Sequence, residues 1–494
     1  MSKNSEQQPL VENVSSNTYG SNTIEGGDVS AIESNGSKVL LTSPRQEIYA
    51  ISKSSLPLIV TFLLQYSLTV VSIFSVGHIG KTELAAVSLA TMTFNVTSSI
   101  FNGMATCLDT FCSQAYGAKK YNLVGLYFQR CTAMILVMSI PLVVLWCFSF
   151  HFLKYIVTDL RLAYLAQSYL RVIAFGVPGY IFFETGKRFL QAQGIFVAGQ
   201  YSLFICAPLN ILLNYLLVWN SYIGIGFLGA PLATAICYWG MSFLLLSYAL
   251  FIDGKNCWSG LKLKESFRHW GPMMTLALNG TAMLLSEFIA FEILTLSAAS
   301  LGTSVLAAQS IVSTMATLAF QIPFSISVAA STRIANFIGG GYLKSAQIAT
   351  NVSLIGSLFV GIFNFSILFF FKGPIARSFT SDKSVYTISL SIISILAVNQ
   401  LYDCLNVLAA GCLRGQGRQQ VGSTLNLIAY YIVAVPLALT LAFKFDWGIK
   451  GLWSGLGCGV LILALSETYF VVNSDWTKIV EEADKRNNLG EVPA

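Results

Sequence analysis

Three carboxylic acids lie within long stretches that are otherwise almost free of charge. Glu287 and Glu292 belong to the segment LLSEFIAFEIL, and Asp403 belongs to NQLYDCLN. A carboxyl group that is shielded from water can hold a proton or a cation and exchange one for the other. Residues five apart on a helix point about 140° away from each other, so Glu287 and Glu292 cannot share one narrow face. These three acids are the candidate residues for cation or proton coupling.

Uncharged polar residues in the same kind of apolar stretch could contact an organic ligand. The predicted substrate-binding residues are Gln65, Asn95, Asn210, Gln309 and Tyr431. The competing interpretation is that such residues hold neighbouring helices together by hydrogen bonds, which is the commoner role of polar side chains between apolar helices.

Other kinds of chemistry have little support in the sequence. The chain has only 3 histidines, and its 10 cysteines stand singly, with Cys107 and Cys112 as the closest pair. Isolated cysteines in apolar surroundings usually behave as buried, inert thiols. We therefore expect no metal, no cofactor and no catalytic residue, and we do not expect an enzyme.

The elements that must position these residues are predicted by composition. Hydrophobic residues make up 54% of the 494 positions and charged residues only 11%, against roughly 25% in an ordinary soluble protein. Uncharged runs recur that are long enough, at about 20 residues each, to cross a bilayer. We predict an all-α integral membrane protein with twelve transmembrane helices, at residues 54–77, 84–106, 123–149, 162–183, 194–218, 227–252, 270–297, 305–330, 347–371, 384–410, 419–443 and 449–472.

The distribution of Lys and Arg predicts the orientation of these spans. With the N-terminus in the cytosol, most basic residues fall in the tails and the even-numbered loops, as the positive-inside rule requires. Both termini are therefore predicted to be cytosolic. The same bias explains the net charge of +6, which is no argument for nucleic-acid binding. The predicted divisions are a disordered cytosolic tail (1–48), a first lobe (49–252), a cytosolic inter-lobe loop (253–269), a second lobe (270–475) and a cytosolic tail (476–494).

The sequence repeats itself at an offset of about 222 residues. Leu84-Ala85-Ala86 matches Leu306-Ala307-Ala308, Gly117 matches Gly339, and Leu190-x-x-Gln193-Gly194 matches Leu413-x-x-Gln416-Gly417. Six spans per half is an even number, so both halves enter the membrane from the same side and the repeats are parallel. Two six-helix lobes of this kind can enclose a central cleft that opens to either face by rocking.

The landmark segments resemble the eukaryotic multidrug and toxic compound extrusion (MATE) transporters, and fungal members look most similar. The resemblance covers about residues 50–475. It rests on CLDTFCSQAYGAKK (107–120), which we interpret as the first-half loop between spans, and on VGHIG (76–80), FGVPGYIFFETGKRFLQAQGIF (175–196), VLAAQSIV (305–312), FSISVAASTRIANFIGGG (324–341) and GCLRGQGRQ (411–419).

This resemblance implies a function. Acids of the seventh and tenth spans are linked to proton coupling and cation binding in that family, and the matching positions here are Glu287, Glu292 and Asp403. It implies a proton-coupled antiporter, with sodium as the less favoured ion, that exports small organic cationic or amphipathic molecules. The expected partners are that substrate, protons and the lipid bilayer, and a monomer is expected, in the vacuolar or plasma membrane. Ser72 departs from the family, because bacterial relatives often carry an Asp there.

Two alternatives stay open at this point. The first is a transporter of the major facilitator type, which also has two parallel six-helix halves, although its basic loop motif after the second span is not matched. The second is a flippase for a lipid-linked molecule, which should show a more basic cleft to hold a phosphate. An acidic cleft favours export of organic cations instead.

Overall fold

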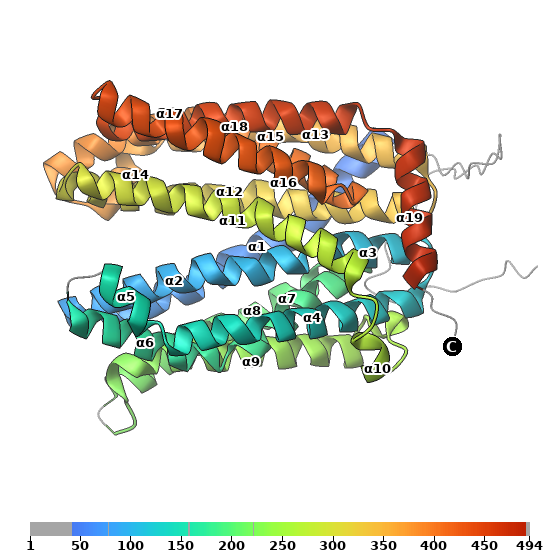
Figure 1. The fold of residues 1–494 in the computed structure, drawn as a ribbon, viewed down its shortest axis with the longest axis horizontal. Helices are drawn as coiled ribbons and strands as arrows, with labels where there is room; N and C mark the ends of the chain where they lie inside the picture. Colours follow the sequence, from blue (N-terminus) through green and yellow to red (C-terminus); the bar gives the residue numbers. More distant parts are fainter. Residues whose placement is uncertain (1–41, 78, 157–158, 221, 491–494) are drawn as a thin grey trace, which may run out of the picture.

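The chain is helical almost throughout in the computed structural model, which describes residues 42–490 apart from 78, 157–158 and 221 (Figure 1). The predicted disordered tail lies outside the described residues up to position 41. Its last residues do not fit the prediction, because the first helix already begins at Pro44. The predicted C-terminal tail is mostly the helix Trp476–Gly490.

The described residues of the first half form nine α-helices with short π- and 3-10 segments. They are α1 (Pro44–Gly77), α2 (Lys81–Ala105), α3 (Cys107–Gly117), α4 (Tyr121–Cys147), α5 (Phe150–Ile156), α6 (Leu160–Ala174), α7 (Val177–Ala192), α8 (Val197–Asn214), η1 (Tyr215–Trp219), η2 (Gly226–Leu228) and α9 (Gly229–Phe251). The second half follows after η3 (Lys255–Cys257) and α10 (Leu263–Ser266). It consists of α11 (Gly271–Ser300), α12 (Thr303–Gly339), α13 (Leu343–Phe370), α14 (Lys372–Phe379), α15 (Lys383–Gln416), α16 (Gln419–Leu427), η4 (Ile428–Ala434), α17 (Val435–Leu439), η5 (Thr440–Lys444), α18 (Gly448–Val472) and α19 (Trp476–Gly490).

Eleven helical segments of the described chain are long and apolar enough to cross a membrane. The remaining predicted span, 162–183, is present as two shorter helices, α6 and α7, that divide at Phe175–Gly176. Pro178 lies in the first turn of α7, where its missing N–H leaves no helical hydrogen bond unmade. The twelve predicted spans therefore agree with the structure, with the fourth interrupted.

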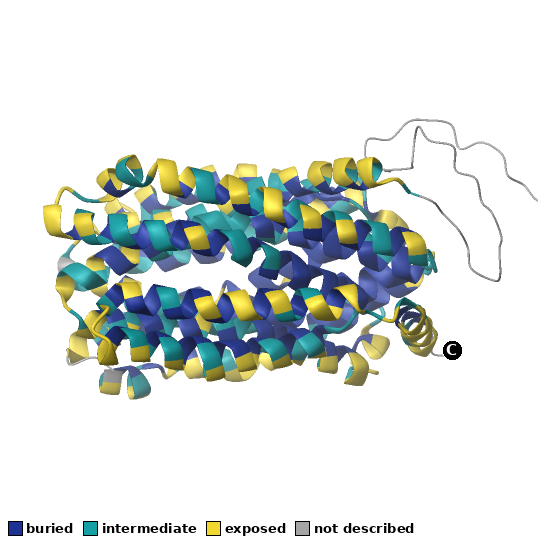
Figure 2. Ribbon diagram, turned by 90° about the horizontal axis from the view of Figure 1, so that it is seen from above, coloured by how far each residue is buried: buried dark blue, intermediate teal, exposed yellow. Residues whose placement is uncertain are grey.

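The helices gather into two lobes that lie side by side (Figure 1). One large cluster of buried apolar side chains runs from Leu68 to Ala277 and forms the core of the first lobe. Two further clusters, from Ala290 to Leu463 and from Ile334 to Ala483, form the core of the second. Seen from above, buried residues line the inner faces of the helices and exposed residues the outer faces (Figure 2). Apolar side chains on those outer faces suit contact with lipid.

The repeat is visible in the helices themselves. Residues 81–117 form α2 and α3, and the positions 222 residues later, 303–339, form the single helix α12. The interpretation of residues 107–120 as a loop is therefore wrong for most of that segment, because Cys107–Gly117 is helix α3. Its residues from Cys107 to Ala115 are all buried. A buried loop would leave backbone N–H and C=O groups without partners, and a helix satisfies them internally.

Candidate functional site

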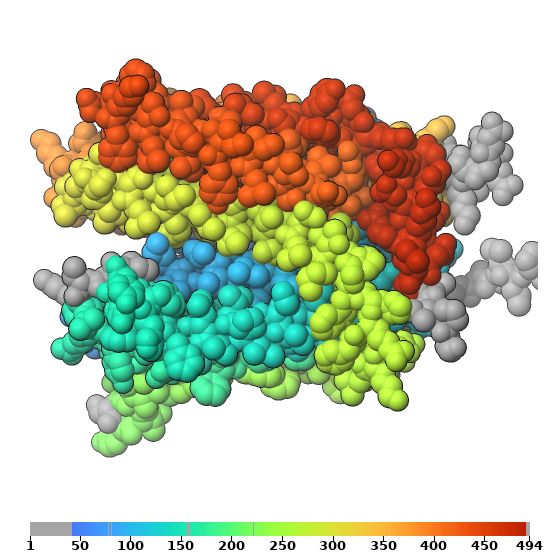
Figure 3. All heavy atoms as spheres, viewed as in Figure 1, coloured from blue at the N-terminus to red at the C-terminus, as the bar shows by residue number. Residues whose placement is uncertain are grey.

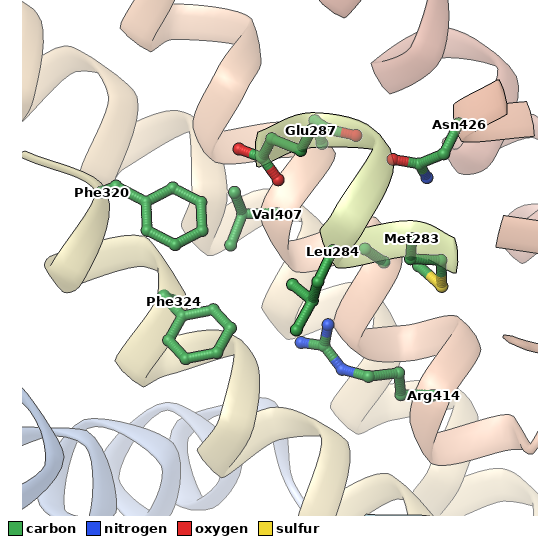
Figure 4. A pocket seen from close by; sticks show the side chains of 10 residues that line it. Met283, Leu284, Glu287, Phe320, Phe324, Val407, Arg414 and Asn426 are labelled. Atoms are coloured by element: carbon green, nitrogen blue, oxygen red, sulfur yellow. The ribbon is translucent and has the colours of Figure 1, made fainter. Parts of the chain in front are cut away.

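A small pocket, with a cavity volume of about 30 Å³, lies inside the second lobe between α11, α12, α15 and α16 (Figure 4). Its polar side chains are Glu287, Arg414, Asn406 and Asn426, and its apolar wall is formed by Met283, Leu284, Phe320, Phe324, Val407 and Ala410. A pocket with a few convergent polar groups on an apolar wall is the usual form of a small-molecule site.

Glu287 is the sequence-predicted acid that lines this pocket. Asp403 precedes the lining residue Val407 by about one turn of α15, and its carboxyl group is an electrostatic neighbour of that of Glu287. The Gln400 side chain holds Asp403 in place, because its Nε2 donates to Asp403 Oδ2 at 3.4 Å. The fold thus brings together Glu287 and Asp403, which are 116 positions apart in the sequence.

Glu292 is placed differently from Glu287. It is half-buried in α11 and is not among the residues that line the pocket. This matches the direction expected for a residue five positions further along a helix. The structure therefore separates the two glutamates of this helix and pairs Glu287 with Asp403 instead.

Sequence reasoning missed the cation of this pocket, Arg414. Its side chain is 4% exposed and its guanidinium lies 5.8 Å from the centre of the Phe324 ring. Nη2 donates to Ser327 Oγ at 2.8 Å, while Nε has no hydrogen-bond partner among the described residues. The prediction ended the tenth span at residue 410, but α15 continues to Gln416 and carries Arg414 into the lobe.

Glu467 was also missed, although it lies in the predicted span 449–472. It is fully buried in α18, and its Oε1 accepts a hydrogen bond of 3.0 Å from Asn426 Nδ2. Asn426 in turn lines the pocket. An acid inside a predicted span is the signal that could have found it, since ionisable groups at membrane depth are costly and rare.

The first lobe uses Gln65 in another way than the sequence predicted. Gln65 Nε2 donates to Glu184 Oε1 at 2.8 Å, and Lys187 Nζ lies 2.9 Å from the same oxygen. Glu184 is 3% exposed, so this is a buried ion pair within α7 to which α1 contributes the amide. In this conformation the charges of Glu184 and Lys187 compensate each other, and the Gln65 amide is hydrogen-bonded to Glu184.

The other predicted substrate-binding residues do not converge on one site. Asn210 is fully buried in α8 and contacts Cys237 and Asn214, and Gln309 is fully buried and accepts a hydrogen bond of 2.8 Å from Trp453 Nε1. Tyr431 donates its hydroxyl to the backbone oxygen of Ser286 at 3.2 Å. Asn95 alone is exposed, on α2.

A smaller pocket, with a cavity volume of about 10 Å³, occupies the first lobe. Its lining contains no carboxylic acid and consists of Thr69, Thr91, Phe94, Tyr169, Ile173, Thr234 and Tyr238. Nearby, the hydroxyl groups of Ser72 and Thr234 lie 2.9 Å apart. The charged pocket of this protein therefore belongs to the second lobe, while the pocket of the first lobe carries hydroxyl groups and aromatic rings.

The two lobes are joined at the end of the bundle where α1 begins and α19 lies, which we call the α19 end. There α3 of the first lobe reaches α15 of the second. Thr110 Oγ1 donates to the Arg414 backbone oxygen at 2.6 Å, and Gln114 Nε2 donates to the Gly415 oxygen at 3.1 Å. Gln419 returns a hydrogen bond of 2.8 Å to Thr110 Oγ1.

Ion pairs support the same region. Glu47 at the start of α1 and Arg333 of α12 form a two-pronged pair across the lobes, with both N–O distances 3.0 Å. Within the first lobe, Arg188 Nη1 lies 2.6 Å and 2.7 Å from the two carboxylate oxygens of Asp109. That pair fixes α3 to α7, so the surface that α3 presents to the second lobe is held in place.

At the opposite end the lobes diverge. The space-filling view shows the surface hollowed between them there, whereas at the α19 end they touch (Figure 3). A molecule closed at one end and hollow at the other has the form of one state of a two-lobed carrier. The second-lobe pocket is lined by the acid Glu287 and by Arg414, which can bind protons and small charged molecules.

Comparisons with known proteins agree with this architecture. The family model described as MatE matches the chain twice, at residues 57–216 and 281–440, once in each lobe. An uncharacterised transporter of Saccharomyces cerevisiae is 48% identical over 440 residues, which are 89% of this chain. This chain spans 63% of the length of that relative.

More distant relatives carry more specific names. The multidrug and toxin extrusion protein 1 of Homo sapiens is 31% identical over 473 residues, covering 94% of this chain and 82% of the human protein. Among solved structures, a eukaryotic MATE transporter superposes with a TM-score of 0.85 at 28% identity, over 90% of this chain and 99% of that one.

Proposed function

Because this chain belongs to the MatE family, we propose that it is a secondary active antiporter that exports small organic molecules from the cytosol in exchange for protons. The substrates are cationic or amphipathic, and sodium is the less favoured coupling ion. Family membership makes the chain a transporter and excludes the major facilitator alternative. The coupling ion, the direction and the substrate class are the proposal.

The observation that carries the proposal is that Glu287 lines the second-lobe pocket and that Asp403, one turn before the lining residue Val407, lies near enough to act on it electrostatically. Two neighbouring half-buried carboxyl groups cannot both ionise without cost unless a positive charge compensates them. A proton or an organic cation supplies that charge, so the two compete for the same place. Competition for one site is what an exchange carrier requires, provided that the site opens to one side at a time.

Alternating exposure has a structural basis in the two ends of the bundle. The hydrogen bonds of Thr110, Gln114 and Gln419 close the α19 end, and the opposite end is hollow. With the predicted orientation, the α19 end faces the cytosol and this conformation faces outward. Proton binding would then occur from the outer or luminal side and release of substrate would occur to that side.

The flippase alternative gains no support from the pocket. A lipid-linked phosphate needs a basic site, whereas Arg414 shares this pocket with Glu287, and Asp403 acts on Glu287 from nearby. The lining aromatic residues Phe320 and Phe324 suit the apolar part of an organic cation.

Transport into proteoliposomes tests the proposal. Vesicles with an acidic interior should accumulate radiolabelled tetraethylammonium, a permanent organic cation, from neutral medium. A protonophore should collapse the accumulation, and replacement of sodium by potassium on both sides should leave it intact. Accumulation that needs sodium and ignores the pH gradient would overturn proton coupling, and absence of any gradient-driven uptake of organic cations would overturn the substrate class.

A further inference from the structure

The second lobe holds a third acid near the half-buried Glu287 and Asp403, and this one is fully buried. Glu467 is 0% exposed, and one of its two carboxylate oxygens, Oε2, has no hydrogen-bond partner among the described residues. Its other oxygen accepts from Asn426, which lines the pocket together with Glu287. This buried carboxyl group on α18 is therefore linked to the pocket through Asn426.

The charged and titratable groups around Glu467 come from several helices. They are Arg414 and Cys412 of α15, Glu287 of α11 and Tyr430 of η4, with Asn426 of α16 as its hydrogen-bond donor. None of the salt bridges between described residues, at a limit of 4.0 Å, includes Glu467. Arg414 therefore acts on Glu467 through space without contacting it.

The acidic side chains around Glu467 and Arg414 outnumber the basic ones. Glu287 and Glu467 both interact electrostatically with Arg414, and Asp403 interacts with Glu287. The ion pair Asp109–Arg188, which also acts on Arg414, is neutral by itself and leaves the count unchanged. Fully ionised, the three acids and the one guanidinium would keep two uncompensated negative charges on buried and half-buried side chains, which is unfavourable. Two monovalent positive charges would neutralise them.

The three acids are not equivalent in position. Glu287 lies near the middle of α11, whereas Glu467 lies in the last turns of α18, toward the α19 end. Asn426 connects the two places, because it lines the Glu287 pocket and binds Glu467. Of the two positive charges that would neutralise the acids, one would be held by Glu287 and Asp403 and the other by Glu467.

We propose that Glu467 is a second proton-binding residue of the second lobe. It takes up one proton in each transport cycle, in addition to the proton held by the Glu287–Asp403 pair. The step converts a carboxylate and a proton into a carboxylic acid, and the proton leaves again on the α19 side. This inference rests on the proposed function, because it concerns the number of protons exchanged for each substrate.

The number of protons exchanged is a thermodynamic quantity, so it separates this role from a structural one. In proteoliposomes held at zero membrane potential with potassium and valinomycin, the steady-state accumulation ratio of tetraethylammonium is measured at several imposed pH differences. The slope of the logarithm of that ratio against the pH difference equals the number of protons exchanged per cation. A variant whose transport rate is lowered but whose proton stoichiometry is unchanged reaches the same slope more slowly.

Glu467→Gln keeps a hydrogen-bonding side chain of the same size, and Glu467→Leu is the second neutral variant, because an apolar replacement of a buried charge is often tolerated. Both should lower the slope by one relative to the unmodified protein, while Glu467→Asp should keep it. The matched control is Glu481→Gln, the same substitution at an exposed position of α19, which should leave the slope unchanged.

The outcomes separate the two proposals. If the unmodified protein shows a slope of zero, the proton-coupled function itself fails and the role of Glu467 fails with it. If the unmodified protein responds to the pH gradient and a folded neutral variant keeps the full slope, the function stands and the inference about Glu467 is overturned.

Discussion

Gly117 of α3 and Gly339 of α12 pack reciprocally against each other's helices. A side-chain carbon at Gly117 would overlap the backbone oxygen of Asn336, and one at Gly339 would overlap the backbone oxygen of Gln114. The 222-residue offset converts one contact into the other, since 114 corresponds to 336 and 117 to 339. The pseudo-twofold axis of the molecule therefore passes between these helices.

The first prediction concerns that approach. Gly117→Ala and Gly339→Ala should each destabilise the closed α19 end by about 1–3 kcal/mol, because the added methyl group meets backbone that cannot move aside. A cysteine placed at Thr110, in a protein without its native cysteines, should then react faster with a maleimide. Gly356→Ala is the matched control, since a side-chain carbon there meets open space. Equal labelling rates in all three variants would contradict the role of this contact.

The second prediction concerns the pair Glu47–Arg333. Glu47 is fully buried and Arg333 joins it to the second lobe with two hydrogen bonds. Glu47→Gln should lower the midpoint of thermal unfolding, because Arg333 then loses its counter-charge. The exchange of both residues, Glu47→Arg with Arg333→Glu, should recover part of the loss. The pair Glu83–Arg161, in which Arg161 is exposed and the two side chains are 4.0 Å apart, is the comparison, and its neutralisation should change the midpoint little.

The third prediction concerns α19, which spans the two lobes. Ile479 and Ala483 pack into the second lobe, while Tyr127 of the first lobe donates to the Arg486 backbone oxygen at 3.1 Å. Removal of residues 476–494 should favour the conformation that opens at the α19 end, since these contacts stabilise only the closed one. Substrate offered from that side should bind with a lower apparent Kd. A higher or unchanged Kd in a folded truncated protein would contradict this role.

The fourth prediction separates the two glutamates of α11. Glu287→Gln should abolish accumulation driven by a pH gradient, because Glu287 lines the pocket beside Asp403. Glu292→Gln should retain most of it, because Glu292 is not among the residues that line the pocket. Asp403→Asn should behave like Glu287→Gln. Surface expression and the thermal midpoint serve as controls for folding, and a greater loss in Glu292→Gln than in Glu287→Gln would reverse the assignment.

Much of the architecture followed from local properties of the sequence. Uncharged stretches of sufficient length predicted the spans, and the structure contains them. The constant offset between Gly117 and Gly339 predicted two parallel repeats, because an even number of spans returns the chain to the side from which it started. An acid in an apolar run, such as Glu287, drew attention to the second lobe for a similar reason, since lipid makes its presence costly.

Which polar groups meet was decided only by the tertiary structure. Gln309 and Asn210 are as polar as Asn426. Helix packing nevertheless buries Gln309 and Asn210 among other side chains, whereas it places Asn426 in the lining of the pocket. Arg414 and Glu467 lie in the sequence 127 and 180 positions after Glu287. Hydrophobicity sets how deep a residue lies, but the rotation of each helix about its own axis decides what its side chain faces. That rotation is fixed by contacts between helices distant in sequence, such as Gly117 against Asn336, which no local pattern encodes.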